Sequence, residues 1–166
     1  FKSLYGTSGV MYSSPGRINL IGEHTDYNGG FVLPGAIDKA MYCEIKPNGT
    51  DKVRAFALDL EESAEFGLGE NDLPAKQWAK YIYGVCREMI KKGKSIPGFD
   101  CVFAGDVPLG AGMSSSAALE SCFGFAINDT YNLGFDRFEL AFIGQATEHN
   151  YVGVMWNYGP ICFLLR

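Results

Sequence analysis

The chain has 166 residues, of which 47% are hydrophobic and 20% are charged, a composition typical of a globular protein with a sizeable core. A net charge of -5 argues against a nucleic-acid partner, because neutralising phosphates requires clustered Lys and Arg side chains. The apolar runs are too short to cross a membrane, and no signal peptide is visible after Phe1.

The cysteines and histidines show no spacing typical of a disulfide framework or a metal site. The five cysteines (Cys43, Cys86, Cys101, Cys122 and Cys162) form no Cys-x-x-Cys pair. Reduced, mostly buried thiols in a cytoplasmic protein are therefore expected. His24 and His149 lie far apart in the sequence, without a second histidine at metal-site spacing.

Short apolar stretches bounded by turn residues predict the strands in the first part of the chain. The first stretch, Val10–Ser14, is expected to run into a turn formed by Pro15 and Gly16. Further strands are expected over residues 31–33, 40–46, 53–58 and 63–66, and the last two would form a hairpin.

Helical spacing of apolar residues dominates the second part of the chain. Helices are expected over Trp78–Lys92, Ser114–Tyr131 and Phe138–Val152, with a short strand over Cys101–Ala104 between the first two. Strands and helices mix without strict alternation. The expected fold class is therefore α+β, built as a two-layer α/β domain.

A glycine- and serine-rich stretch, Pro108–Glu120, follows a predicted strand and opens a predicted helix. Such a turn presents free backbone N–H groups and the positive end of a helix dipole to an anion. It is not a Walker A loop, because no Gly-Lys-Ser/Thr follows. The alternative is a helix that begins with small residues and serine N-caps, and the two interpretations are balanced on this stretch alone.

A second polar stretch, Pro15–Asn28, places Arg17 close to a glutamate, a histidine and an aspartate. The guanidinium fork of arginine suits phosphate oxygens, and closely spaced acceptors can hold several sugar hydroxyls. The alternative is a solvated loop with surface salt bridges. The neighbouring apolar residues 18–21 look buried, and a polar cluster beside a buried segment favours the functional interpretation.

Three later side chains have both a structural and a functional interpretation. Trp78 and Tyr81 could stack on an adenine, although their spacing is that of core packing on an amphipathic helix. Glu148 would ordinarily be a solvated side chain at the end of a helix. It becomes functional only as the partner of a magnesium ion shared with a serine.

The polar stretch Pro15–Asn28 and the glycine- and serine-rich stretch Pro108–Glu120 resemble the galactokinases of the GHMP small-molecule kinase superfamily. Residues 16–27, Gly-Arg-Ile-Asn-Leu-Ile-Gly-Glu-His-Thr-Asp-Tyr, are similar to the galactokinase signature, and residues 108–117 are similar to the GHMP phosphate-binding motif. The resemblance spans residues 1–154 and implies a GHMP kinase N-terminal domain, with a ribosomal protein S5 domain 2-like fold. It also implies ATP-dependent phosphorylation of galactose at the anomeric hydroxyl, giving galactose 1-phosphate.

The resemblance also implies a role for each matching residue. The galactose-binding positions match Glu23, His24, Thr25 and Asp26. The ATP-binding positions match Gly110, Ala111, Gly112, Met113, Ser114, Ser115 and Ser116, with Trp78 against the adenine. Ser116 and Glu148 match the pair that holds Mg²⁺. Arg17 matches the arginine that stabilises charge on the transferring phosphate.

The sequence departs from the family after Val154. Family members carry a catalytic aspartate twelve residues after the glutamate of the last helix, and Pro160 stands at that position here. The residues Met155–Arg166 can be encoded by a DNA sequence that also has a second meaning. When that DNA is translated starting from its second base, it gives the family continuation Cys-Gly-Ile-Met-Asp-Gln-Phe. This tail is therefore expected to be frame-shifted, and the C-terminal GHMP domain is expected to be absent. A chain of this kind should aggregate and turn over negligibly.

Other functions remain open on the sequence. Retained sugar and phosphate motifs without a base also suit a catalytically dead sensor that binds galactose and ATP. A kinase for a related sugar, such as N-acetylgalactosamine or arabinose, is a further alternative, as is a broken gene product without function. The expected partners are galactose and ATP, with no nucleic acid and no membrane.

Overall fold

The computed structural model describes residues 1–21, 31–107 and 114–153. Its centre is a five-stranded sheet with the strand order β1-β2-β5-β3-β4, in which only β3 and β5 are parallel neighbours. The strands are β1 (Val10–Ile21), β2 (Leu33–Pro47), β3 (Lys52–Ala57), β4 (Glu62–Gly67) and β5 (Phe99–Gly105). β3 and β4 form the hairpin that the sequence predicts.

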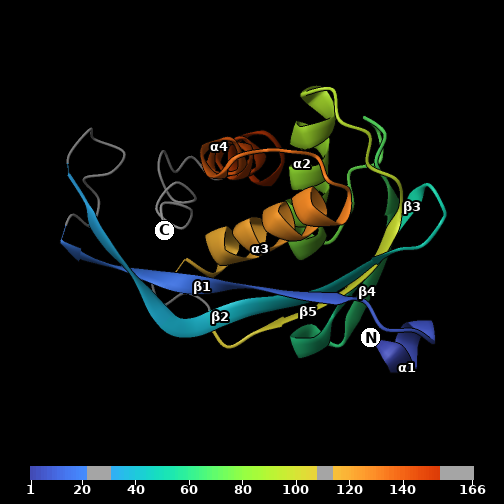
Figure 1. Ribbon diagram of the computed structural model, residues 1–166, viewed down its shortest axis with the longest axis horizontal. Helices are drawn as coiled ribbons and strands as arrows, with labels where there is room; N and C mark the ends of the chain where they lie inside the picture. Colours follow the sequence, from blue (N-terminus) through green and yellow to red (C-terminus); the bar gives the residue numbers. More distant parts are fainter. Residues whose placement is uncertain (22–30, 108–113, 154–166) are drawn as a thin grey trace.

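Three helices cover one face of this sheet (Figure 1). They are α2 (Gln77–Lys91), α3 (Ser115–Thr130) and α4 (Arg137–Thr147), and a single π-helical turn, η3 (Glu148–Val152), continues α4. The short helices α1 (Lys2–Tyr5) and η2 (Leu58–Leu60) lie on the other side of the sheet. The predicted two-layer α+β class is confirmed.

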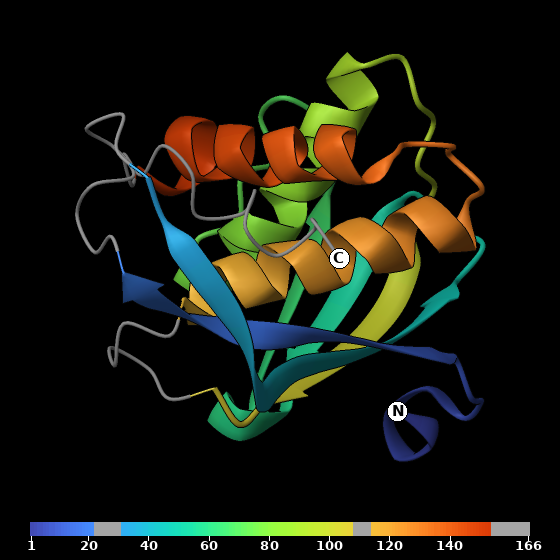
Figure 2. The same ribbon diagram turned by 60° about the vertical axis from the view of Figure 1, so that its left-hand side comes forward.

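The helices form where the sequence supplies an apolar stripe and a starting signal. On α2, Ile82, Val85 and Met89 recur at helical spacing, and all three are fully buried. α4 begins with a capping box, in which Asp136 and Glu139 each accept a backbone N–H of the other. α3 is apolar on most of its surface because it lies between the sheet and α4 (Figure 2).

The core lies between the sheet and the helices and is centred on β5. Phe99 and Cys101 of β5 are fully buried, and they pack with Cys43 and Ile45 of β2. Cys43, Cys86, Cys101 and Cys122 are all free and buried, as the sequence predicts, and Cys162 lies outside the described residues.

Three predicted element boundaries are wrong. Pro15 and Gly16 form no turn, because β1 runs through them with a shift in its pairing to β2 between Pro15 and Arg17. The two strands predicted over residues 31–33 and 40–46 are one continuous strand, β2, which begins at Leu33. The helix predicted to end at Val152 changes to a π-turn after Thr147.

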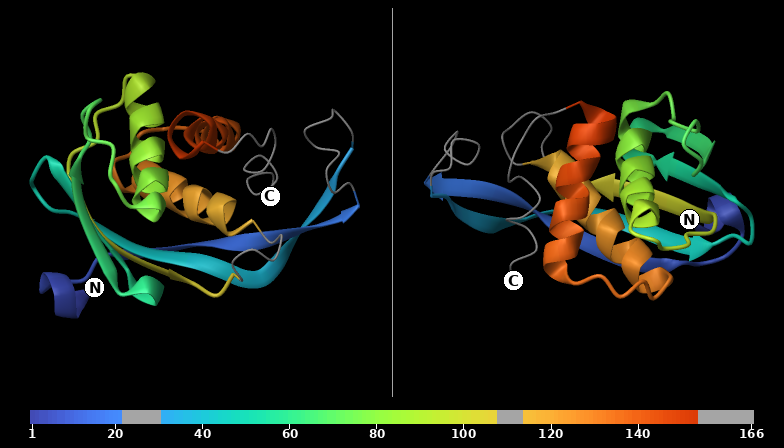
Figure 3. Two further views of the ribbon diagram at one scale, coloured as in Figure 1. Left: turned by 180° about the vertical axis from the view of Figure 1, so that it is seen from behind. Right: turned by 90° about the horizontal axis from the view of Figure 1, so that it is seen from above.

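The apolar residues after Arg17 are exposed, which corrects the expectation that they are buried. Ile18, Leu20 and Ile21 are 36%, 64% and 71% exposed. They lie on the part of the β1–β2 ribbon that extends beyond the helices (Figures 1 and 3), so none of the described helices covers either of its faces. Within the described residues, no helix is long and apolar enough to span a membrane.

Candidate active site

The structure describes about half of the residues that the sequence assigns to a site. Arg17, Trp78, Ser114, Ser115, Ser116 and Glu148 have described positions. The predicted sugar-binding residues Glu23, His24, Thr25 and Asp26 lie outside the described residues, as do the predicted phosphate-binding residues Gly110, Ala111, Gly112 and Met113.

Ser116 and Glu148 come together although they are far apart in the sequence. The Ser116 hydroxyl, in the first turn of α3, donates a hydrogen bond to Glu148 Oε1 at 3.1 Å. Glu148 is the first residue of η3 and is only 3% exposed. Its other oxygen, Oε2, is buried and makes no hydrogen bond. One acceptor of this carboxylate therefore remains available to a ligand.

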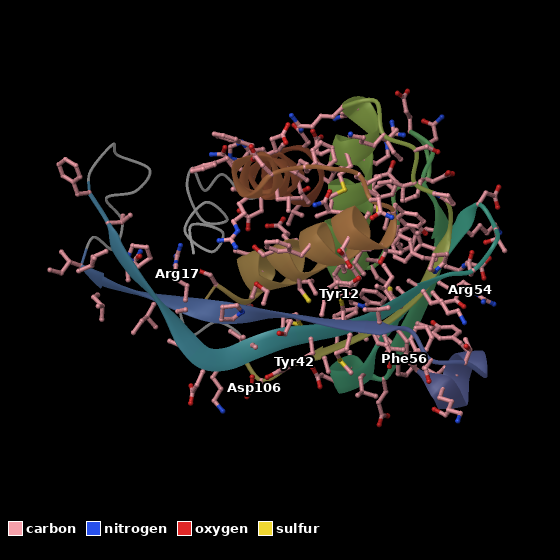
Figure 4. All side chains as sticks on the ribbon, in the orientation of Figure 1. Tyr12, Arg17, Tyr42, Arg54, Phe56 and Asp106 are labelled. Carbon is pink, nitrogen blue, oxygen red and sulfur yellow. The ribbon has the colours of Figure 1, made fainter. Side chains whose placement is uncertain are left out.

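Arg17 reaches the same place from the sheet. An uninterrupted strand would put Tyr12 and Arg17 on opposite faces, because side chains alternate. The pairing of β1 with β2 shifts between Pro15 and Arg17, and both side chains lie toward the helices (Figure 4), where the Tyr12 hydroxyl donates to Asp129 of α3 at 2.6 Å. Arg17 is 9% exposed, and its positive charge acts on Glu148.

The ionisation of Glu148 reflects these neighbours. Burial raises its pKa above the ordinary value, while the Ser116 hydrogen bond, His149 and Arg17 lower it, so the net effect is a raised pKa. A cation bound at the carboxylate would favour the charged form.

Helix α2 holds η3 in position. The Asn150 side chain donates to Glu88 of α2 at 3.0 Å, and Lys91 donates to the same carboxylate oxygen at 2.7 Å. The Tyr151 ring contacts Tyr83 edge to face, with 5.5 Å between ring centroids. Two contacts from α2, at Asn150 and Tyr151, thus hold the turn that presents Glu148.

Two side chains, Glu120 and Tyr81, lie beside the Ser116–Glu148 pair although the sequence did not predict either of them there. Glu120 is 2% exposed, and burial and the charge of Glu148 hold its pKa well above its usual range. Tyr81 of α2 lies close to both carboxylates, and burial, followed by the charges of Glu120 and Glu148, raises its pKa to about 12. The available signal was spacing, because Glu120 follows Ser116 by four residues and shares its helical face.

Helix α3 begins after Ser114, and the backbone N–H groups of its first turn have no carbonyl partner within the helix. Ser114 is the N-cap residue, with a left-handed backbone (φ 52°), and its side chain makes no capping hydrogen bond. The Ser116 hydroxyl is turned to Glu148 instead. The serine N-cap interpretation therefore lacks its hydrogen bond at Ser114, and the positive end of the helix dipole remains suited to an anion.

Trp78 makes the contacts of a packed side chain. Its indole N–H donates to Glu62 of β4 at 2.8 Å, and the centroids of its ring and of the Phe103 ring on β5 are 5.3 Å apart. The side chain is partly buried beside the core. The core-packing alternative is confirmed by these contacts, and the adenine contact stays a prediction.

Oxygen ligands suited to Mg²⁺ are present at the Ser116–Glu148 pair. Mg²⁺ prefers carboxylate and hydroxyl oxygens, and the buried, unpartnered Glu148 Oε2 is an oxygen of this kind. In the part of the chain that the structure describes, no group of three or more His, Cys, Asp or Glu side chains could hold a metal. The fit to Mg²⁺ therefore rests on a serine hydroxyl and buried carboxylates.

Two known families match the parts of the chain that contain the predicted sugar-binding and phosphate-binding stretches. The galactokinase galactose-binding signature matches residues 1–47. The N-terminal domain of the GHMP kinases matches residues 80–160.

Individual relatives agree with these matches. A galactokinase from Chloroflexus aurantiacus is 41% identical over 143 residues, which cover 85% of this chain and 36% of the relative. The crystal structure of Lactococcus lactis galactokinase complexed with galactose matches with a TM-score of 0.87 and 36% identity, covering 97% of this chain and 42% of that one. Methanococcus jannaschii mevalonate kinase shares the fold, with a TM-score of 0.75 and 21% identity over 96% of this chain and 52% of that one.

The fold and the paired motifs define a GHMP kinase N-terminal domain. Within that superfamily the chain belongs to the galactokinase family, of which it carries the galactose-binding signature. It spans 36% of the length of the curated relative and 42% of that of the solved galactokinase.

Proposed function

We propose that the protein containing this chain transfers a phosphoryl group from ATP to the anomeric hydroxyl of galactose, giving galactose 1-phosphate. The observation that carries the proposal is the convergence of Arg17, Ser116 and Glu148 from β1, α3 and η3. A fixed cation, a hydroxyl and a buried carboxylate at one place are the groups that phosphoryl transfer requires. The likeness to a galactokinase complexed with galactose supports the choice of sugar.

Each residue then has a defined task in the proposed reaction. Glu23, His24, Thr25 and Asp26 would orient the sugar by accepting and donating hydrogen bonds to its hydroxyls. The backbone of residues 110–116 would hold the phosphates of ATP at the start of α3, and Trp78 would contact the adenine. Arg17 would stabilise the negative charge that develops on the transferring phosphoryl group.

Mg²⁺ is proposed as the cofactor, held by Ser116 and Glu148. When bound there, it would neutralise part of the charge on the phosphates of ATP. The Ser116 hydrogen bond orients Glu148 Oε1, and burial of the carboxylate keeps competing water away.

Four free, buried cysteines support the proposed cytoplasmic location.

We propose that the catalytic base is encoded by the restored reading frame. Pro160 has no acid–base group, although it occupies the position of the family's aspartate. We therefore propose that residues 1–154 form the N-terminal domain and that Met155–Arg166 is an out-of-frame tail. DNA sequencing across the Val154 codon tests this, and an independently confirmed in-frame spelling of the tail would contradict it.

Activity is tested on two proteins: the 166-residue chain and the product of the frame-restored gene. The restored protein should consume ATP when galactose is present, and Arg17→Ala should lower its kcat by about 10²–10³-fold. The 166-residue chain should show negligible turnover. A restored protein that phosphorylates N-acetylgalactosamine or arabinose but not galactose would overturn the proposed substrate.

Pro160 also favours a second candidate, a sensor that binds galactose and ATP without turnover. The two candidates differ in the protein that the confirmed DNA sequence encodes, because a sensor would retain Pro160, bind both ligands by calorimetry and still release no ADP. Turnover with galactose would exclude the sensor.

A further inference from the structure

Glu120 is unusual among the buried carboxylates of the chain. It is 2% exposed, and neither of its carboxylate oxygens makes a hydrogen bond. By contrast, Glu88 is 8% exposed and accepts hydrogen bonds from Lys91 and Asn150. Asp100 is 6% exposed and forms a two-pronged ion pair with Arg54. Glu120 has the most complete burial of the three and no such partner.

A buried carboxylate without hydrogen bonds is strongly unfavourable, since it loses its hydration and gains nothing in return. Such a group is retained where a ligand satisfies it or where it stays protonated. The position of Glu120 in the fold therefore decides whether it binds a ligand or only packs in the core.

The position of Glu120 is that of a neighbour of the Ser116–Glu148 pair. Glu120 follows Ser116 by one helical turn on α3, which places the two Cβ atoms about 5–6 Å apart on the same face. The negative charge of Glu148 acts directly on Glu120. Tyr81 of α2 lies near both carboxylates. Three elements, α2, α3 and η3, thus enclose two acidic groups that repel one another.

We propose that Glu120 is a further protein group of the divalent-cation site, where it supplies a second carboxylate beside Ser116 and Glu148. This inference rests on the Mg²⁺ site of the proposed function. A divalent cation offsets both the mutual repulsion of the two carboxylates and the loss of their hydration. It also accounts for three buried oxygens that make no hydrogen bond, one on Glu148 and two on Glu120.

The test measures the binding of Mn²⁺, a spectroscopic substitute for Mg²⁺, to the purified 166-residue chain without nucleotide. Electron paramagnetic resonance gives the free Mn²⁺ during a titration. Glu120→Gln keeps the shape of the side chain and removes its charge, and it should weaken Mn²⁺ binding by about ten- to a hundredfold. Glu148→Gln should have an effect of the same size. The matched control Asp100→Asn, a buried carboxylate of β5 that pairs with Arg54, should bind Mn²⁺ as the wild type does.

Each result decides the matter. Wild-type affinity in Glu120→Gln combined with a loss in Glu148→Gln overturns the role of Glu120 and leaves the proposed Ser116–Glu148 site standing. A wild-type chain that binds no Mn²⁺ overturns both.

A second measurement separates metal binding from a role in the core alone. Without divalent cations, Glu120→Gln should raise the urea midpoint of unfolding, because an amide costs less to bury than a carboxylate that no hydrogen bond satisfies. Mg²⁺ should raise the midpoint of the wild type more than that of the variant. An equal Mg²⁺ effect on both overturns the proposal. If Glu120→Gln fails to fold, Glu120→Asp, which withdraws the carboxylate by one methylene, should still bind Mn²⁺ more weakly, and unchanged affinity overturns the proposal.

Discussion

Gly84 of α2 lies against Thr147 at the end of α4, so closely that a Cβ atom at Gly84 would come within 2.5 Å of Thr147 Cγ2. The same Cβ would come within 2.9 Å of Tyr151 Cδ2 in η3. Only a residue without a side chain allows this approach. The position of Glu148, which immediately follows Thr147, therefore depends on a glycine that has no part in the chemistry.

Gly84→Ala should lower the free energy of unfolding by about 1–3 kcal/mol, because the added methyl forces Thr147 and η3 away from α2. The displacement of Glu148 should also weaken Mn²⁺ binding. Urea unfolding and the Mn²⁺ titration measure the two effects.

Gly124→Ala on α3 is the matched control, because among the described residues its Cβ would meet only Leu140 Cδ2 at 3.8 Å, an ordinary contact. Alanine favours a helix over glycine by about 0.5–1 kcal/mol, so this variant should be as stable as the wild type or more stable. Equal destabilisation of both variants would show that the contact with Thr147 is not the cause.

Asp106 should make the stability of the chain depend on pH at the acid end. Its carboxylate accepts hydrogen bonds from the Ala40 N–H at 2.8 Å and Lys39 Nζ at 3.2 Å, tying the chain after β5 to β2. These contacts lower its pKa below the model-compound value of 3.8. Stability from Asp106 is therefore present above about pH 3.8 and is lost as the pH falls through the lower folded-state pKa.

Asp106→Asn should accordingly be less stable than the wild type at pH 7, with a difference that shrinks below about pH 3.8. Urea midpoints across the acid range measure this difference. Lys39 and Asp106 are both half exposed, so salt should reduce the difference as well. A difference that is constant with pH would show that shape and not charge decides the effect.

The sequence predicts elements whose signals are local. The apolar spacing of α2 and the capping residues of α4 lie within each element, so α2 forms where it is expected and α4 begins close to its expected start. The continuity of β1 through Pro15 and Gly16 depends on pairing with β2, in which Pro15 lies opposite Ala40 and Arg17 lies opposite Ala36. Local turn signals therefore gave the wrong boundary, because tertiary pairing overrides them.

The candidate site could be predicted where residue type and motif coincide, and Ser116 and Glu148 do come into contact. Glu120 could not be predicted in this way, because burial depends on how α2, α3 and η3 pack together. The exposure of Leu20 and Ile21 escaped prediction for the same reason. Apolar residues are ordinarily buried, and only the three-dimensional structure shows that the helices it describes leave this part of the ribbon uncovered.

Trp78 offers a test that separates packing from nucleotide binding. Trp78→Leu should destabilise the chain, because it removes the hydrogen bond to Glu62 and the contact with Phe103. If Trp78 also stacks on the adenine, the frame-restored protein should bind ATP about ten- to a hundredfold more weakly with leucine than with phenylalanine at this position.

Phe66→Leu is the control for this experiment, because Phe66 is also a core aromatic residue, 6% exposed, with its ring against Tyr83. It should lower stability without changing ATP affinity, as measured by calorimetry. ATP affinity that is unchanged in Trp78→Leu would confine Trp78 to packing.

The exposed end of the β1–β2 ribbon should make the 166-residue chain self-associate. β1 is an edge strand, and Leu20, Ile21 and Leu33 are between half and three quarters exposed near its end. An edge strand with apolar side chains pairs readily with another copy. Sedimentation and light scattering should show oligomers that grow with concentration.

The double variant Leu20→Lys, Ile21→Thr should remain monomeric at higher concentration with an unchanged urea midpoint, because neither side chain is in the core. Ile45→Thr, a substitution at a residue that is 1% exposed, should do the reverse by lowering the midpoint and increasing aggregation. Equal aggregation of the wild type and the double variant would place the self-association on another surface.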